Sequence, residues 1–187
     1  MVPAPPSHFP PRVKKETFCL RSVLQSGHSK ATTDRIVAWV GAGPARFAEL
    51  VAIVLGPDVR LAQRAAWPMN YCVEQRPQLL GPHAAALVAL LGRRGDHPAL
   101  RRNVFRMLSL TTVPPGLETE VFSAALDALG ADDEPVAVKA YAMTLLAELA
   151  PLFPGSEGEI RALVREQLPR QSAAFRSRAR QLFGLSA

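Results

Sequence analysis

The chain contains few of the residues that mark specialised classes of protein. Two cysteines, Cys19 and Cys72, among 187 residues are too few for the disulfide framework of a small secreted domain. No Cys and His residues are spaced as zinc ligands, and no two of the four histidines stand four positions apart as in a His-Glu-x-x-His metal site. These absences predict a reduced, cytoplasmic chain that binds no metal and no cofactor.

Long hydrophobic runs are also missing. No stretch of about 18 apolar residues occurs, so no membrane span is expected, and the N-terminus lacks the charged-then-apolar order of a secretory signal. Residues 1–12 contain five prolines instead, which disfavour both helix and sheet. We predict a disordered tail at residues 1–14 and a single domain at 15–187. A start codon assigned too far upstream would also explain such a tail.

Acidic residues are fewer than basic ones. The chain has 16 Asp+Glu against 22 Lys+Arg, a net charge of +6, while hydrophobic residues make up 48% of it. This hydrophobic share is typical of an ordered globular domain, and the length is sufficient to bury a core. The positive charge is compatible with an acidic partner such as nucleic acid, and a solvated, Arg-rich surface explains it equally well.

The apolar residues that remain recur at helical spacing from about residue 31 onward. Phe47, Leu50 and Val54, for example, share one helix face. Neither sustained alternation nor an Asn-Gly or Asp-Gly hairpin turn is present, so strands are not expected. The predicted helices lie near 44–55, 58–76, 82–93, 98–110, 117–130, 134–150, 156–168 and 172–184, with weaker ones at 15–26 and 32–41.

A turn residue followed six positions later by a basic residue recurs four times along the chain. The pairs are Asp58 with Arg64, Asp96 with Arg102, Asp133 with Lys139, and Ser172 with Arg178. Successive basic residues are 38, 37 and 39 positions apart, which indicates an internal repeat. An Asp or Ser in a turn can accept hydrogen bonds from the N–H groups that open the next helix. We expect each basic residue to reach a turn aspartate of its own or a neighbouring repeat, so that these residues form a structural ladder.

This pattern resembles the HEAT repeat, in which antiparallel helix pairs stack into a right-handed, armadillo-like α-solenoid. The resemblance implies an all-α fold with pairs at 44–76, 82–110, 117–150 and 156–184, preceded by an N-terminal cap. Each pair has an apolar stripe that neighbouring pairs must cover. In HEAT arrays the second helix of each pair usually lines the concave face.

A narrower likeness rests on the segments 28–30, 46–50, 63–67, 102–108, 135–139 and 174–180. In these segments the chain is similar to short bacterial HEAT-like proteins without an established activity. Members of that family sometimes carry an adenylosuccinate lyase label. The lyase loop Ser-Ser-x-Met-Pro-x-Lys-x-Asn is absent here, because the sequence contains no Ser-Ser at all.

No group of residues in the sequence points to catalysis. No serine or cysteine has the context of an activated nucleophile. The segment 41–44, Gly-Ala-Gly-Pro, superficially resembles a phosphate-binding turn, but it follows a predicted helix and lacks the Walker lysine. We therefore predict that the chain is not an enzyme.

The features that suggest a function are arginines and one tryptophan on the predicted second helices. The candidate partner surface comprises Trp67, Arg101, Arg106, Arg176 and Arg180. We predict an interaction module that binds a protein or peptide partner. The alternative is a nucleic-acid-binding protein whose concave arginines contact phosphates, as in the HEAT-like alkylpurine DNA glycosylases.

Overall fold

The computed structural model describes residues 18–92 and 98–185, and within these residues it contains α- and 3-10 helices and no strand. The all-α prediction is therefore confirmed for this part of the chain. The α-helices are α1 Leu20–Ser26, α2 Lys30–Val40, α3 Pro44–Val54, α4 Val59–Gln75, α5 Ala84–Val88, α6 Pro98–Leu108, α7 Glu118–Gly130, α8 Val136–Leu149, α9 Ser156–Gln167 and α10 Ala173–Phe183. The 3-10 segments are η1 Pro77–Leu79, η2 Gly81–His83, η3 Ala89–Gly92, η4 Ala150–Leu152 and η5 Leu168–Arg170.

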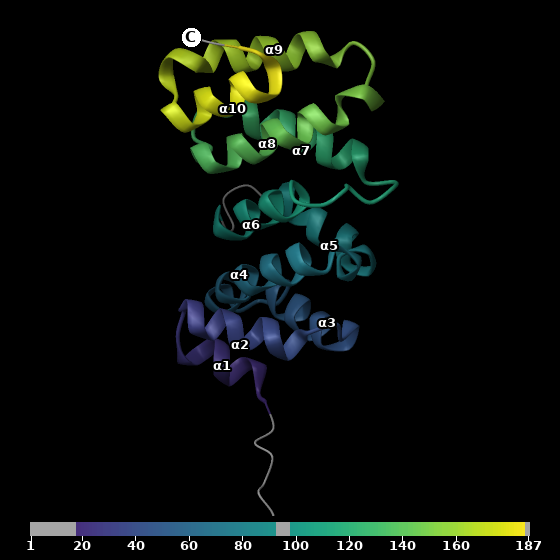
Figure 1. Ribbon diagram of the computed structural model, residues 1–187, viewed down its shortest axis with the longest axis vertical. Helices are drawn as coiled ribbons and strands as arrows, with labels where there is room; N and C mark the ends of the chain where they lie inside the picture. The colour runs from purple at the N-terminus through teal and green to yellow at the C-terminus, as the bar shows by residue number, and fades with distance from the viewer. Residues whose placement is uncertain (1–17, 93–97, 186–187) are drawn as a thin grey trace, which may run out of the picture.

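The helices stack along one axis, with α1 at one end and α10 at the other (Figure 1). Helices α2, α4, α6, α8 and α10 pack on one another in that order, while α3 packs on α4 and α7 packs on α8. Such a layered stack of helix pairs is the solenoid architecture that the repeat predicts. We call the surface formed by α2, α4, α6, α8 and α10 the second-helix face.

One predicted helix, 82–93, is wrong as a single element. The structure divides this segment into η2, α5 and η3. Its buried residues Ala84, Leu87, Val88 and Leu91 nevertheless keep helical spacing. The apolar period therefore matches the buried side of the segment, but it did not predict that the segment tightens into 3-10 turns at both ends.

The core runs continuously through the stack. Phe47, Phe105 and Phe175 are each 0% exposed and belong to α3, α6 and α10. Burial of each such ring contributes about 1.5–3 kcal/mol to folding. Small buried residues such as Ala65 and Ala179 lie on the second helices, where they let neighbouring helices approach closely.

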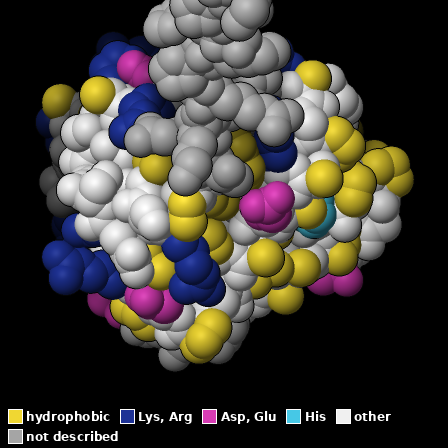
Figure 2. All heavy atoms as spheres, turned by 90° about the horizontal axis from the view of Figure 1, so that it is seen from below, with side chains coloured by type: hydrophobic (Ala, Val, Ile, Leu, Met, Phe, Trp, Pro, Cys, Tyr) yellow, Lys and Arg dark blue, Asp and Glu magenta, His cyan; other side chains and the backbone are white. Residues whose placement is uncertain are grey.

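The N-terminal end of the stack has two chemically different sides (Figure 2). In this view Lys and Arg side chains gather mainly on the left, which is the side on which α2 and α4 lie in Figure 1, and hydrophobic side chains gather mainly on the right. The basic residues of this end are therefore found chiefly on the side of the second helices.

Candidate partner-binding site

The predicted ladder is present only in its capping contacts. Asp58 accepts a hydrogen bond from Leu61 N at 3.0 Å, and Ser172 accepts one from Phe175 N at 3.3 Å. Arg64, however, does not bond to Asp58: its Nη1 donates to the carbonyl oxygens of Leu24 and Gln25 at the end of α1, at 2.9 and 3.0 Å. The first basic residue of the series thus binds a helix end rather than a turn aspartate.

The other basic residues of the series correct the ladder in the same way. Lys139 is 1% exposed and its Nζ donates to Gln167 Oε1 at 2.6 Å, whereas Asp133 is exposed. Arg178 donates to Gln181 Oε1 at 3.2 Å. A residue six positions along a helix has risen about 9 Å from the turn. Arg64 and Lys139 therefore bond to nearer groups on neighbouring helices, and Arg178 bonds to a residue of its own helix, α10. Asp96 lies outside the described residues.

The structure reverses the roles predicted for two adjacent arginines. Arg101, expected on the partner surface, is 4% exposed; its Nη1 donates to Leu91 O at 2.8 Å and its Nη2 lies 3.3 Å from a Glu134 carboxylate oxygen. Arg102, expected in the ladder, is exposed. Arg101 is therefore a structural residue, and Arg102 belongs to the surface.

Arg102 lies at a small hollow between α4 and α6, with a volume of about 210 Å³. The loop before α2 closes one side of it. We call this hollow the arginine basin. Its lining residues are His28, Arg60, Gln63, Arg64, Trp67, Ala99, Arg102 and Asn103. Three guanidinium groups thus meet in one hollow, and none of the lining residues among 18–92 and 98–185 is an Asp or Glu.

The exposed side of α4 explains part of this convergence. Gln63 and Arg64 follow Arg60 by three and four positions, and Trp67 follows it by seven. At this spacing all four side chains lie along one face of the helix. Arg60 and Gln63 are exposed, and Trp67 is half-buried. This helical spacing was a signal in the sequence from which Arg60 and Gln63 were predictable. His28 and Asn103 had no such signal, because other segments bring them to the basin.

Next to the basin, aromatic rings and an arginine pack together. The Trp67 ring meets the rings of His28 and Tyr71 edge-on, at centroid distances of 6.4 and 5.7 Å. The Arg106 guanidinium lies 5.9 Å from the Trp67 ring centroid and 5.5 Å from that of Tyr71, within cation–π range. Its Nη2 also pairs with Glu74 at 3.2 Å. The structure thus brings Trp67 and Arg106 together, as members of one surface.

The two remaining predicted surface arginines lie apart from the basin, on α10. Arg180 is exposed and Arg176 is half-buried, donating to the Gln171 carbonyl. Helix α8 packs between α6 and α10, and its one basic residue is the buried Lys139. The arginines of the second-helix face therefore form two separate groups.

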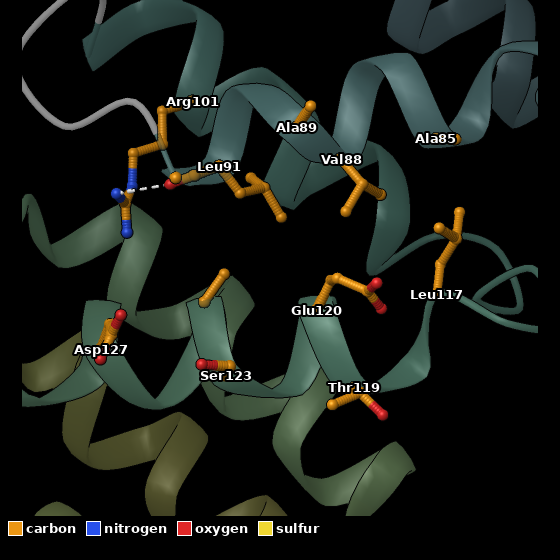
Figure 3. A pocket seen from close by; sticks show the side chains of 12 residues that line it. Ala85, Val88, Ala89, Leu91, Arg101, Leu117, Thr119, Glu120, Ser123 and Asp127 are labelled. Carbon is orange, nitrogen blue, oxygen red and sulfur yellow. Dashed lines mark hydrogen bonds between the residues drawn. The ribbon is translucent and has the colours of Figure 1, made fainter.

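A larger hollow of about 790 Å³ lies between η3 and α7, on the side of the first helices. Figure 3 shows Arg101 at one end of it, bonded to Leu91 O, and Glu120 on the opposite wall. Its other lining residues are Ala85, Val88, Ala89, Gly92, Leu117, Thr119, Ser123, Ala124 and Asp127. This hollow is mainly apolar, with charges of both signs, so it differs in chemistry from the arginine basin.

The groups with shifted pKa values do not line the basin. Burial raises the pKa of the Cys72 thiol to about 12 and raises the pKa of the Glu148 carboxyl. Burial lowers the pKa of the Lys139 ammonium, and a hydrogen bond from Ser22 lowers the pKa of the exposed Cys19 thiol.

None of the helices formed by residues 18–92 and 98–185 is both long and apolar enough to cross a membrane. Within the same residues, no three His, Cys, Asp or Glu side chains come together in a way that suits a metal ion.

A family model described as a HEAT repeat domain matches residues 20–183 of the chain. Neither the curated proteins nor the solved structures gave a match to the chain. The family match spans every described α-helix, from α1 to α10.

Proposed function

Because the chain belongs to the HEAT repeat family, we propose that it is a non-enzymatic α-solenoid module that binds a protein partner through its second-helix face. The observation that carries this proposal is the arginine basin together with the adjoining cluster of Trp67, Tyr71 and Arg106. Trp, Tyr and Arg are the residues that contribute most often to the binding energy of protein interfaces.

The arrangement of these residues suits a binding surface. Arg106 is held by two rings and by Glu74, and Arg64 is held by the end of α1. Side chains already fixed in place lose less conformational entropy when a partner binds. The surface is therefore partly organised before the partner arrives.

The absence of catalysis is part of the same proposal. HEAT repeat families are typically non-catalytic scaffolds, and they present extended surfaces for binding. Binding of a partner requires the positive charge and the aromatic side chain that line the basin.

Site-specific cross-linking tests the proposal. A photoreactive amino acid at Gln63, exposed in the basin, should capture a defined protein in cells, and the product should disappear when Arg102→Glu is added. The same amino acid at Arg165, an exposed residue of α9, is the matched control and should not capture that protein. Identical products from both positions, or none from Gln63, would contradict the proposal.

Nucleic acid is the second candidate partner, because the exposed arginines of α4, α6 and α10 carry the charge that phosphates need. A phosphate backbone requires a continuous basic track, and α8 interrupts it. Titration of fluorescent DNA and RNA over a salt series decides between the two. Binding that weakens steeply with salt and is lost with both Arg102→Glu and Arg180→Glu would favour nucleic acid.

A further inference from the structure

The arginine basin concentrates positive charge in a confined space. Arg60 and Arg64 of α4 and Arg102 of α6 enter a hollow of about 210 Å³, and its lining within the described part of the chain contains no Asp or Glu. Neither Arg60 nor Arg102 has an ion-pair partner among residues 18–92 and 98–185. Like charges that share a hollow repel one another, and an anion bound between them removes that repulsion. The basin therefore has the electrostatics of an anion receptor.

We propose that the basin binds one phosphorylated side chain carried by a protein segment. The inference rests on the proposed function, whose partner it specifies. A phosphorylated Ser, Thr or Tyr carries a charge of about −1.5 to −2 near neutral pH, whereas a carboxylate carries −1. Guanidinium groups match phosphate oxygens with two parallel hydrogen bonds. Three guanidinium groups are thus better balanced by a phosphoryl group than by a carboxylate.

Part of the basin is preorganised for such a group. Arg64 is fixed through Nη1 by two carbonyl oxygens of α1, at 2.9 and 3.0 Å, so its charge stays at the edge of the hollow. The exposed amide of Gln63 adds neutral hydrogen-bond donors to the lining. Arg60 and Arg102 are exposed, and they are free to close on the ligand from opposite helices.

Three features favour a peptide over a nucleic acid as the source of the phosphate. The volume suits one side chain rather than a strand, and the basic charge does not continue across α8. Nucleic-acid bases also need open aromatic faces on which to stack, whereas Arg106 already lies over the rings of Trp67 and Tyr71. The ligand is therefore expected to be a single phosphate with its peptide flanks.

The test is a binding assay with the full chain and two fluorescent peptide pools of random sequence, identical except for a central phosphoserine or serine. The phosphoserine pool should bind about tenfold more tightly or better, as expected for new charge-assisted hydrogen bonds. Arg102→Glu or Arg60→Glu should abolish that difference, whereas Arg165→Glu on α9 should preserve it. Circular dichroism melting verifies that each variant folds. If Arg102→Glu does not fold, Arg60→Glu provides the test in its place.

The outcomes separate the inference from the function on which it rests. Equal affinity for both pools, or no binding of either, overturns the phosphate inference. If that equal binding is lost with Arg102→Glu, a peptide still binds at the basin and the proposed function stands. A single-stranded DNA oligomer that binds more tightly than the phosphoserine pool, and is lost with the same variant, overturns both in favour of nucleic acid.

Discussion

Asn70 of α4 donates a hydrogen bond from Nδ2 to Asn103 Oδ1 of α6, at 2.9 Å. Both side chains are buried, at 0% and 3% exposure, and each also donates to its own helix, to the Ala66 and Ala99 carbonyls at 2.9 and 2.8 Å. Asn103 lines the arginine basin. This pair therefore joins the two helices on which the basin is built, and fixes how they lie against each other.

Removal of either asparagine of this pair should destabilise the fold. Asn70→Ala leaves the buried Asn103 Oδ1 without its donor, and we expect the free energy of unfolding to fall by about 1–3 kcal/mol. Asn103→Ala should have a comparable effect. The double variant should lose less than the sum of the two, with a coupling of about 0.5–3 kcal/mol measured by urea denaturation. Strict additivity would show that the bond does not link the helices energetically.

The adjacent arginines of α6 should respond oppositely to substitution. Arg101→Ala removes the partner of Leu91 O and leaves the nearly buried Glu134 carboxylate unpaired. We expect a loss of about 3–5 kcal/mol in the free energy of unfolding. Arg102→Ala, at an exposed position, should change it by about 0.5 kcal/mol or less. Denaturant unfolding of the two variants measures the contrast, and equal losses would contradict the reversed assignment.

Lys139 should make stability depend on pH in the alkaline range. Burial lowers the pKa of its ammonium below the ordinary value of 10.5, so between these two pKa values the unfolded chain binds more protons than the folded one. The free energy of unfolding should therefore rise with pH through this window. Below this pH window Lys139 is charged in both the folded and the unfolded chain, and the folded chain bears the full cost of burying the charge. Above pH 10.5 Lys139 is neutral in both.

Lys139→Met removes the titrating group while preserving most of the side-chain volume. The difference in unfolding free energy between wild type and variant, followed by urea denaturation from neutral pH to about pH 10.5, should therefore shift in favour of wild type as the pH rises. Parallel curves over that range would show that Lys139 does not titrate differently on folding.

The two thiols should react at very different rates. Cys19 is exposed, and the hydrogen bond from Ser22 lowers its pKa. Cys72 is 2% exposed, and burial raises its pKa to about 12. Because the thiolate is the reactive form, a disulfide reagent near pH 8 should modify Cys19 rapidly and Cys72 only on unfolding. In the Cys19→Ser variant, fast labelling of the folded protein would contradict the burial of Cys72.

The sequence by itself determined most of the helices, with 82–93 as the exception, and their stacking. Helix α4, for example, was predicted at 58–76 and is found at Val59–Gln75, with Asp58 at its cap. The spacing of apolar residues and the capping interactions involve residues that are close together in the chain. They can therefore be predicted from the sequence without knowledge of the fold. The repeat of about 38 residues also predicted that the helix pairs stack, because each pair has an apolar stripe that the next pair must cover.

The tertiary structure alone decided which arginines are buried and which meet. Arg101 and Arg102 are neighbours in the sequence, yet one contacts Glu134 and the other faces the basin. His28, Arg60 and Arg102 are widely separated in the chain. Arg60 and Arg102 meet because α4 packs on α6, and His28 joins them because α1 and α2 pack on α4. Successive residues of an α-helix are rotated by about 100° around its axis, so adjacent side chains point in different directions. The position of the neighbouring helix then determines whether each side chain is buried in the core or exposed at the surface.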